Sequence, residues 1–154
     1  MASIQRPARE TGIRHLGPGI EFNLISAIFE FLPDGLAFID PNLVIRAANK
    51  VFAQQVRRPL ASTVDHPVEE VIPGWTEQIG PIYRQVQETG RPFQGDAEPF
   101  VFREQPERGV TYWECTVFPV YEPDGGFEGH LLVHREVTER VRGDRECDDL
   151  RAEA

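Results

Sequence analysis

The sequence predicts an α+β domain in which a five-stranded antiparallel sheet carries short helices on one face and a further helix at each end. The strongest observation is a pair of strand-like runs, 110–120 and 127–137, joined by a turn with Pro, Asp and two Gly. A shorter pair, 36–39 and 43–47, flanks the turn Asp40-Pro41-Asn42. Between these pairs the chain changes to helical spacing, which places several helices in its middle.

The first patterned segment is a helix over residues 22–32 that Pro33-Asp34-Gly35 ends. Residues 1–21 before it are polar and without a clear period, so we expect a mobile extension. The apolar face of the helix comprises Leu24, Ile25, Ile28 and Phe29. We expect this face to be buried, either on the outer face of the sheet or against the same helix of a second copy, and a homodimer through this helix is our hypothesis.

The middle of the chain predicts three helices and one strand. Helical spacing runs over 48–58 and again over 76–89, with a fresh start at Pro81, and a short helix over 68–71 follows Pro67. The third strand, over 92–104, contains Gly95 and Pro99, which indicate a bulge or a sheet edge.

The last strand runs without a breaker into charged, helix-compatible sequence. Residues 129–137 are apolar in their middle, and 138–142 continue directly into the segment 141–154, which we interpret as the start of a C-terminal signalling helix. Because strand and helix are continuous, a change within the sheet can reach the helix.

Composition narrows the classes of function. The chain has 154 residues, a net charge of -9 and a pI near 4.9, which argue against nucleic acid and anionic membrane as direct partners. Its two cysteines, Cys115 and Cys147, are not expected to pair, which fits a reducing, cytoplasmic compartment. Cys115 alternates with Trp113 and Val117, as a small core residue would, and no acid/base arrangement of carboxylates is visible. We therefore do not expect an enzyme.

Five segments, in order, resemble the PAS family of sensory domains. They are Leu-Pro-Asp-Gly-Leu-Ala-Phe-Ile-Asp at 32–40, Ile-Arg-Ala-Ala-Asn-Lys-Val-Phe at 45–52, Glu-Thr-Gly-Arg-Pro-Phe at 88–93, the hairpin 118–129, and Glu-Val-Thr-Glu-Arg at 136–140. The last resembles the family's closing Asp-Ile-Thr-Glu-Arg, with Glu136 where the family usually has Asp. The resemblance covers 22–142 and implies a PAS fold, with the domain itself at 22–140.

The resemblance also implies a role. Such domains dimerise through flanking helices and drive an effector: a histidine kinase, a diguanylate cyclase or a transcription regulator. We expect a sensory module of this kind, with a shift of the last strand passed to the C-terminal helix, and with Glu136 and Thr138 as the coupling residues. The alternative is a ligand-free dimerisation or protein-interaction module.

The family binds its ligands between the sheet and the central helices. The residues we expect to line such a site are Trp75, Tyr83, Trp113, Phe118, Leu132 and His134. The same aromatic residues could instead fill the core. His130, Leu132 and His134 share one face of the last strand, and the sequence leaves open whether that face is inward.

The cofactor remains unknown from the sequence. The haem-binding branch of the family usually takes its iron ligand from the long helix, and 76–89 holds no His; the flavin branch needs a cysteine in the central helices, which have none. His130 and His134 would lie about 13 Å apart on a strand, too far to share a metal ion. A haem-binding redox or gas sensor is the third alternative, although the long helix lacks the usual ligand, and no metal site is predicted.

Overall fold

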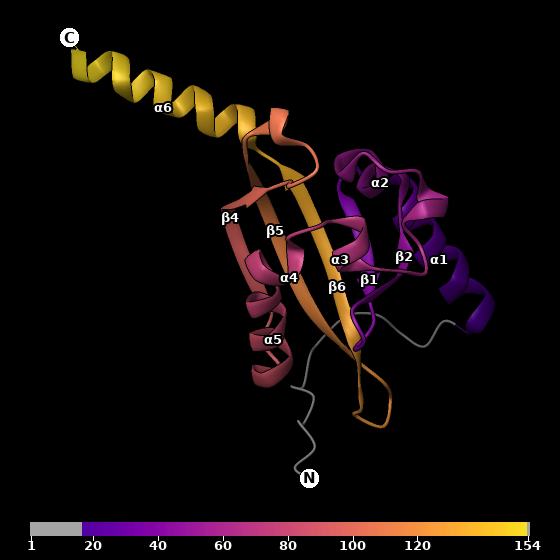
Figure 1. Cartoon of the computed structure of the whole chain (residues 1–154). Coiled ribbons are helices and arrows are strands. Elements are labelled where there is room, and N and C mark those ends of the chain that lie inside the picture. The colour runs from indigo at the N-terminus through magenta and orange to yellow at the C-terminus, as the bar shows by residue number, and fades with distance from the viewer. Residues whose placement is uncertain (1–16, 154) are drawn as a thin grey trace.

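The computed structural model describes residues 17–153. Its central element is a single antiparallel sheet (Figure 1). The strands lie in the order β3-β2-β1-β6-β5-β4. Their bounds are Gly35–Ile39 for β1, Val44–Ala48 for β2, His66–Pro67 for β3, Phe93–Val101 for β4, Val110–Tyr121 for β5 and Phe127–Glu136 for β6. The α+β architecture is confirmed, with six strands in place of five. The added strand, β3, is only two residues long, too short to show a period of two in the sequence.

Four short helices cover one face of the sheet, and two longer helices flank it (Figure 1). The covering helices are α2 (Lys50–Val56), α3 (Val68–Val71), α4 (Trp75–Gln78) and α5 (Gly80–Thr89). The predicted helix over 76–89 is divided between α4 and α5, and the second part starts at Gly80-Pro81 as the proline indicated.

The first covering helix is fastened to the sheet by its capping residue. The side-chain oxygen of Asn49 accepts hydrogen bonds from the backbone N–H of Phe52 (2.9 Å), in the first turn of α2, and of Leu36 (3.0 Å), in β1. The amide nitrogen of Asn49 donates to the carbonyl of Asp34 (2.9 Å). Because all these groups are satisfied by one buried side chain, the entry of α2 is fixed relative to β1.

The long hairpin predicted at the C-terminal end is present. Strands β5 and β6 pair antiparallel from Trp113 opposite Glu136 to Tyr121 opposite Phe127. At Gly129, φ is +147°, and a Cβ atom would lie 2.4 Å from the carbonyl oxygen of Ile39. Only glycine fits where β6 passes this close to β1.

The core lies between the sheet and the covering helices, and β6 contributes to it with one face. His130, Leu132 and His134 are buried there, so the face that the sequence left open is the inward one. Leu131 and Val133 point to the other face and are half-buried.

The N-terminal helix α1 (Pro18–Phe31) has no buried residue. It begins four residues before the predicted start, so part of the predicted extension is helical; residues 1–16 of that extension lie outside the described part. Phe22 is 70% exposed and Phe31 is 78% exposed. The predicted burial of the apolar face on the sheet of the same chain is therefore not observed.

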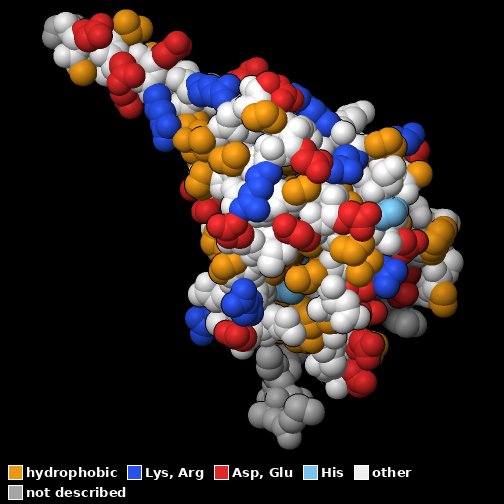
Figure 2. Space-filling view, viewed as in Figure 1, with side chains coloured by type: hydrophobic (Ala, Val, Ile, Leu, Met, Phe, Trp, Pro, Cys, Tyr) orange, Lys and Arg blue, Asp and Glu red, His pale blue; other side chains and the backbone are white. Residues whose placement is uncertain are grey.

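The C-terminal helix α6 (Thr138–Glu153) continues β6 and projects away from the domain (Figure 1). Its surface is dominated by acidic and basic side chains beyond the first turns (Figure 2). Within residues 17–153, no helix combines the length and the apolar character that crossing a bilayer would require.

Candidate functional site: a core cavity and the strand–helix junction

A cavity of about 70 Å³ lies between the inner face of the sheet and helices α2, α4 and α5. Five of the six residues predicted for a pocket line it: Trp75, Tyr83, Trp113, Leu132 and His134. The sixth, Phe118, does not line it. Its neighbour Val117 faces the cavity, and successive residues of a strand point to opposite faces, so Phe118 lies on the outer face of β5.

Aromatic rings in edge or tilted contact form much of the cavity wall. The rings of Trp75 and Tyr83 are 4.7 Å apart, as are those of Trp113 and His134, and Phe52 meets His134 at 5.3 Å. Sequence reasoning missed Phe52, which sits at the third position of α2. Its place on the inward face of that helix, beside Val56, was the available signal.

His134 is a buried polar residue with an unused hydrogen-bonding atom. Its Nε2 has no hydrogen-bond partner among the described residues. This atom lies 3.1 Å from the position that a Cβ would take on Gly35, and Oε1 of Gln55, also without a partner, lies 1.9 Å from that position. Burial lowers the pKa of His134 to about 3, so the ring is neutral at physiological pH.

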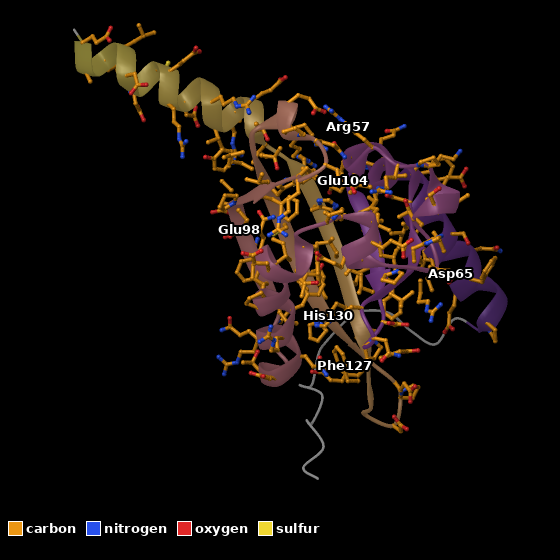
Figure 3. The ribbon with its side chains drawn as sticks, in the orientation of Figure 1. Arg57, Asp65, Glu98, Glu104, Phe127 and His130 are labelled. Carbon is orange, nitrogen blue, oxygen red and sulfur yellow. The ribbon has the colours of Figure 1, made fainter. Side chains whose placement is uncertain are left out.

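Tyr83 and His130 continue this pattern along α5 and β6. The Nε2 of His130 lies 2.9 Å from the carbonyl oxygen of Tyr83 and must donate to it, which leaves Nδ1 as an acceptor without a partner among the described residues. Burial lowers the pKa of His130 and raises that of Tyr83, whose hydroxyl also has no partner there. Figure 3 shows His130 beside Phe127 near the end of β6 that adjoins the hairpin turn.

Two further titratable residues line the cavity at the side of β4. Burial is the main cause that raises the pKa of Cys115 to about 11, with the charge of Glu98 adding to it. The thiol is therefore protonated at neutral pH and is not activated as a nucleophile. Glu98 is half-buried and lies on the edge strand β4 (Figure 3).

The predicted coupling residues meet where β6 ends and α6 begins. The hydroxyl of Thr138 donates to Oε2 of Glu136 (2.7 Å) and accepts from the backbone N–H of Tyr112 in β5 (2.9 Å). The N–H of Val137 donates to the carbonyl of Tyr112 (2.8 Å). The first residues of α6 are thus hydrogen-bonded to β5 as well as continuous with β6.

Arg108, which sequence reasoning missed, connects this junction to the cavity wall. It donates to Oε1 of Glu136 (2.9 Å), to the carbonyl of Gln55 at the end of α2 (2.8 Å) and to Oε1 of Gln105 (3.0 Å). Its guanidinium also lies 4.1 Å from the centre of the ring of Phe102, which lines the cavity. Only 6% of the Arg108 side chain is exposed.

Gln55 and Arg142 extend the network in both directions. The side-chain nitrogen of Gln55 donates to the carbonyl of His134 (3.2 Å), which joins α2 to the cavity segment of β6. Arg142, in the second turn of α6, donates to the carbonyl of Arg108 (3.0 Å). Arg108 is therefore in contact both with Phe102, which lines the cavity, and with Arg142 of α6.

Residues 17–153 contain no cluster of three or more His, Cys, Asp or Glu side chains that could hold a metal ion. His130 and His134 instead make separate aromatic contacts along β6.

Solved structures of similar fold include a PAS domain from Colwellia psychrerythraea (18% identity, TM-score 0.64, 77% of this chain and 98% of that one). An RNA-binding light-oxygen-voltage receptor matches 97% of this chain and 41% of its own, with 13% identity and a TM-score of 0.69. The VqmA–ligand–DNA complex from Vibrio cholera matches at 19% identity and a TM-score of 0.60, over 80% of this chain and 53% of VqmA. This chain thus spans about half or less of the latter two proteins.

Comparison with curated proteins found no significant match. The family model described as the PAS fold matches residues 29–142, well over half of the chain. That range includes the whole sheet, the cavity and the junction with α6. The chain therefore belongs to the PAS family.

Proposed function

We propose that this chain is a sensory or regulatory PAS module in which occupation of the core cavity changes the position of β6 and, through the junction at Glu136 and Thr138, of helix α6. The downstream effector would be a histidine kinase, a diguanylate cyclase or a transcription regulator. The observation that carries this proposal is Arg108, which contacts the cavity residue Phe102 and the junction residue Glu136 with one side chain.

The coupling follows from how the polar groups are shared. If a ligand displaces Phe102 or the end of α2, the guanidinium of Arg108 has to move or lose a hydrogen bond. Glu136 then loses a partner, and its bond to Thr138 at the start of α6 readjusts. A ligand that prefers one of two such arrangements shifts the population of α6 positions by its difference in affinity.

The cavity volume favours a small ligand. Typical sites for drug-sized ligands have volumes of roughly 300–1,000 Å³, whereas this cavity holds about 70 Å³. A molecule of a few non-hydrogen atoms fits, and a larger one requires the short helices α4 and α5 to move outward. Haem would require a much larger enlargement, so the cavity does not favour a haem sensor.

We propose that the module binds rather than catalyses. The protonated, buried thiol of Cys115 and the pKa of His134, lowered by burial to about 3, support this, because such a thiol is a poor nucleophile and such a ring is a weak base at neutral pH. Both cysteines are free, which supports a cytoplasmic location for the parent protein. The similar VqmA, solved with a ligand and DNA, supports a ligand role by analogy of fold.

The test is amide hydrogen exchange of residues 138–146 in a variant in which a larger side chain of the protein itself occupies the cavity. Leu132→Phe adds a ring at the cavity wall, and we expect the amides at the start of α6 to exchange several-fold faster or slower than in the wild type. In the background of Glu136→Ala or Thr138→Val this response should disappear, because the hydrogen bond between these two side chains is removed, and Glu136→Ala also removes the bond from Arg108.

The matched control is Leu131→Phe, which adds the same ring to the outer face of β6. It should leave exchange in α6 unchanged. Equal responses to the two substitutions, or a response of Leu132→Phe that survives in Thr138→Val, would contradict the proposed coupling.

The second candidate function is a dimerisation module without a ligand, which the exposed helix α1 favours. Leu24, Ile25 and Ile28 are each more than 40% exposed, and Phe29 is half-buried. Ile25→Arg should convert a dimer into a monomer in native mass spectrometry if α1 forms the interface, while Asn23→Arg, an exposed polar position on the same helix, serves as the control. A dimer that persists in Ile25→Arg would exclude this interface.

A further inference from the structure

The cavity is lined almost entirely by uncharged groups. Three of its titratable residues, Tyr83, Cys115 and His134, are neutral at pH 7, because burial disfavours the ionised form of each. None of the described lining residues is Lys or Arg. An anionic ligand would therefore find no countercharge in the cavity wall, and transfer of an unpaired charge from water to such a site is strongly unfavourable.

Glu98, the one charged residue among the described lining residues, lies on the edge strand β4 of the sheet. It follows the bulge between Gly95 and Glu98 in β4, and its side chain packs over Gly95. Being half-buried, the carboxylate remains partly hydrated and adds negative charge to the side of the cavity nearest Cys115. This charge repels an anion further.

The cavity wall nevertheless provides a hydrogen-bonding group. The Tyr83 hydroxyl is enclosed, with the residue 2% exposed, and has no partner among the described residues. A phenol both donates and accepts, so it can pair with a hydroxyl, a carbonyl or an amide of a ligand. The Nε2 of His134 also has no partner among the described residues, but it lies toward Gly35 and Gln55, which do not line the cavity.

From these contacts we infer that the cavity selects a small, uncharged and largely apolar molecule with one polar group that hydrogen-bonds to the hydroxyl of Tyr83, and that it rejects carboxylates of the same shape. The inference rests on the proposed function, since it specifies the ligand class of the same cavity.

The test is an NMR titration of the ¹⁵N-labelled full chain with two probes that share one carbon skeleton: isobutyramide and isobutyrate. We expect isobutyramide to give saturable shifts at residues of β5, β6 and α5 that line the cavity. Isobutyrate should bind about tenfold more weakly or not at all, because it would have to enter the cavity without a countercharge or take up a proton first.

Two variants locate the bound probe. Tyr83→Phe preserves the ring and removes the hydroxyl, and it should weaken isobutyramide binding roughly 2- to 10-fold, the range for loss of one hydrogen bond. Val117→Ile, at the cavity wall, should also weaken binding, whereas Val133→Ile, on the outer face of β6, should not.

Binding of isobutyrate to the cavity as tightly as isobutyramide would overturn the inference and leave the proposed function standing. Absence of saturable shifts with both probes, or equal binding in wild type and Tyr83→Phe, would also overturn it. The exchange experiment on Leu132→Phe uses no ligand, so it decides the proposed function separately.

Discussion

Two neighbouring segments of β6 differ in whether their polar groups have hydrogen-bond partners. In the inward-facing segment 130–134, whose Leu132 and His134 line the cavity, His130 and His134 are buried and each keeps a ring nitrogen without a partner among the described residues. At the end of the strand, Glu136 bonds through both carboxylate oxygens, to Arg108 and to Thr138. Both segments belong to one continuous strand.

From this difference we infer that residues 130–134 respond to a ligand, whereas the junction at Glu136 transmits the response to α6. A buried polar atom without a partner is unfavourable, so a group that hydrogen-bonds to it stabilises the inward-facing segment. Because both carboxylate oxygens of Glu136 have partners, the junction resists small displacements. A displacement that does occur changes which groups are hydrogen-bonded there. The following variants test this difference between the two segments, starting with the largest expected effect.

Arg108→Ala should destabilise the protein by about 3 kcal/mol, because it removes charge-assisted bonds to Gln55 and Glu136 from a buried position. The control is Arg57→Ala. Arg57 pairs with Glu107 at the surface, with 55% of its side chain exposed, and its loss should change stability by no more than about 0.5 kcal/mol. Chemical denaturation measures both, and equal effects would show that the junction is not a buried network.

Acid should lower the free energy of unfolding because His134 is buried in its neutral form. The pKa of His134 is lowered from 6.5 to about 3 in the folded state, so between these values the unfolded chain binds a proton that the folded chain does not. The contribution of His134 to stability is therefore complete above about pH 6.5 and is lost as the pH falls. By about pH 5 the loss amounts to about 2 kcal/mol.

His134→Leu removes this titrating group, and its stability should depend less steeply on pH over the same range. Urea denaturation of both proteins at a series of pH values tests this. Identical slopes in the two proteins would mean that the buried ring does not resist protonation.

Tyr83→Phe should stabilise the ligand-free protein, by about 1 kcal/mol, because it removes a buried hydroxyl without a partner among the described residues. Tyr112→Phe is the comparison, since Tyr112 is half-buried on the outer face of β5 and its ring lies under Arg145. Thermal unfolding distinguishes the two. A large loss of stability in Tyr83→Phe would indicate that its hydroxyl is already bonded in the free protein.

The sequence predicts the parts of the structure that depend on local pattern. The β5–β6 hairpin follows from strand-favouring residues around Asp124-Gly125-Gly126, and the start of α5 follows from Pro81. Alternation along β5 could also have excluded Phe118 from the cavity once Trp113 was assigned to it, because an odd separation along a strand places two residues on opposite faces.

The rest depends on contacts between distant segments. Arg108 lies in a turn, Pro106–Arg108, and its pairing with Glu136 and Gln55 joins residues that local spacing does not relate. The helix α1 has an apolar pattern that predicts burial, yet the pattern does not specify which surface covers it. Whether cavity aromatics meet or leave space depends on side-chain packing that the sequence pattern does not encode.

The central claim, that the cavity wall and the junction are energetically coupled through Arg108, is tested most directly by a double-mutant cycle on Phe102→Leu and Glu136→Gln. We predict a coupling free energy of at least about 0.5 kcal/mol in the wild-type background, which falls to zero when the cycle is repeated in Arg108→Ala. Effects that add to within about 0.3 kcal/mol in both backgrounds would contradict the account.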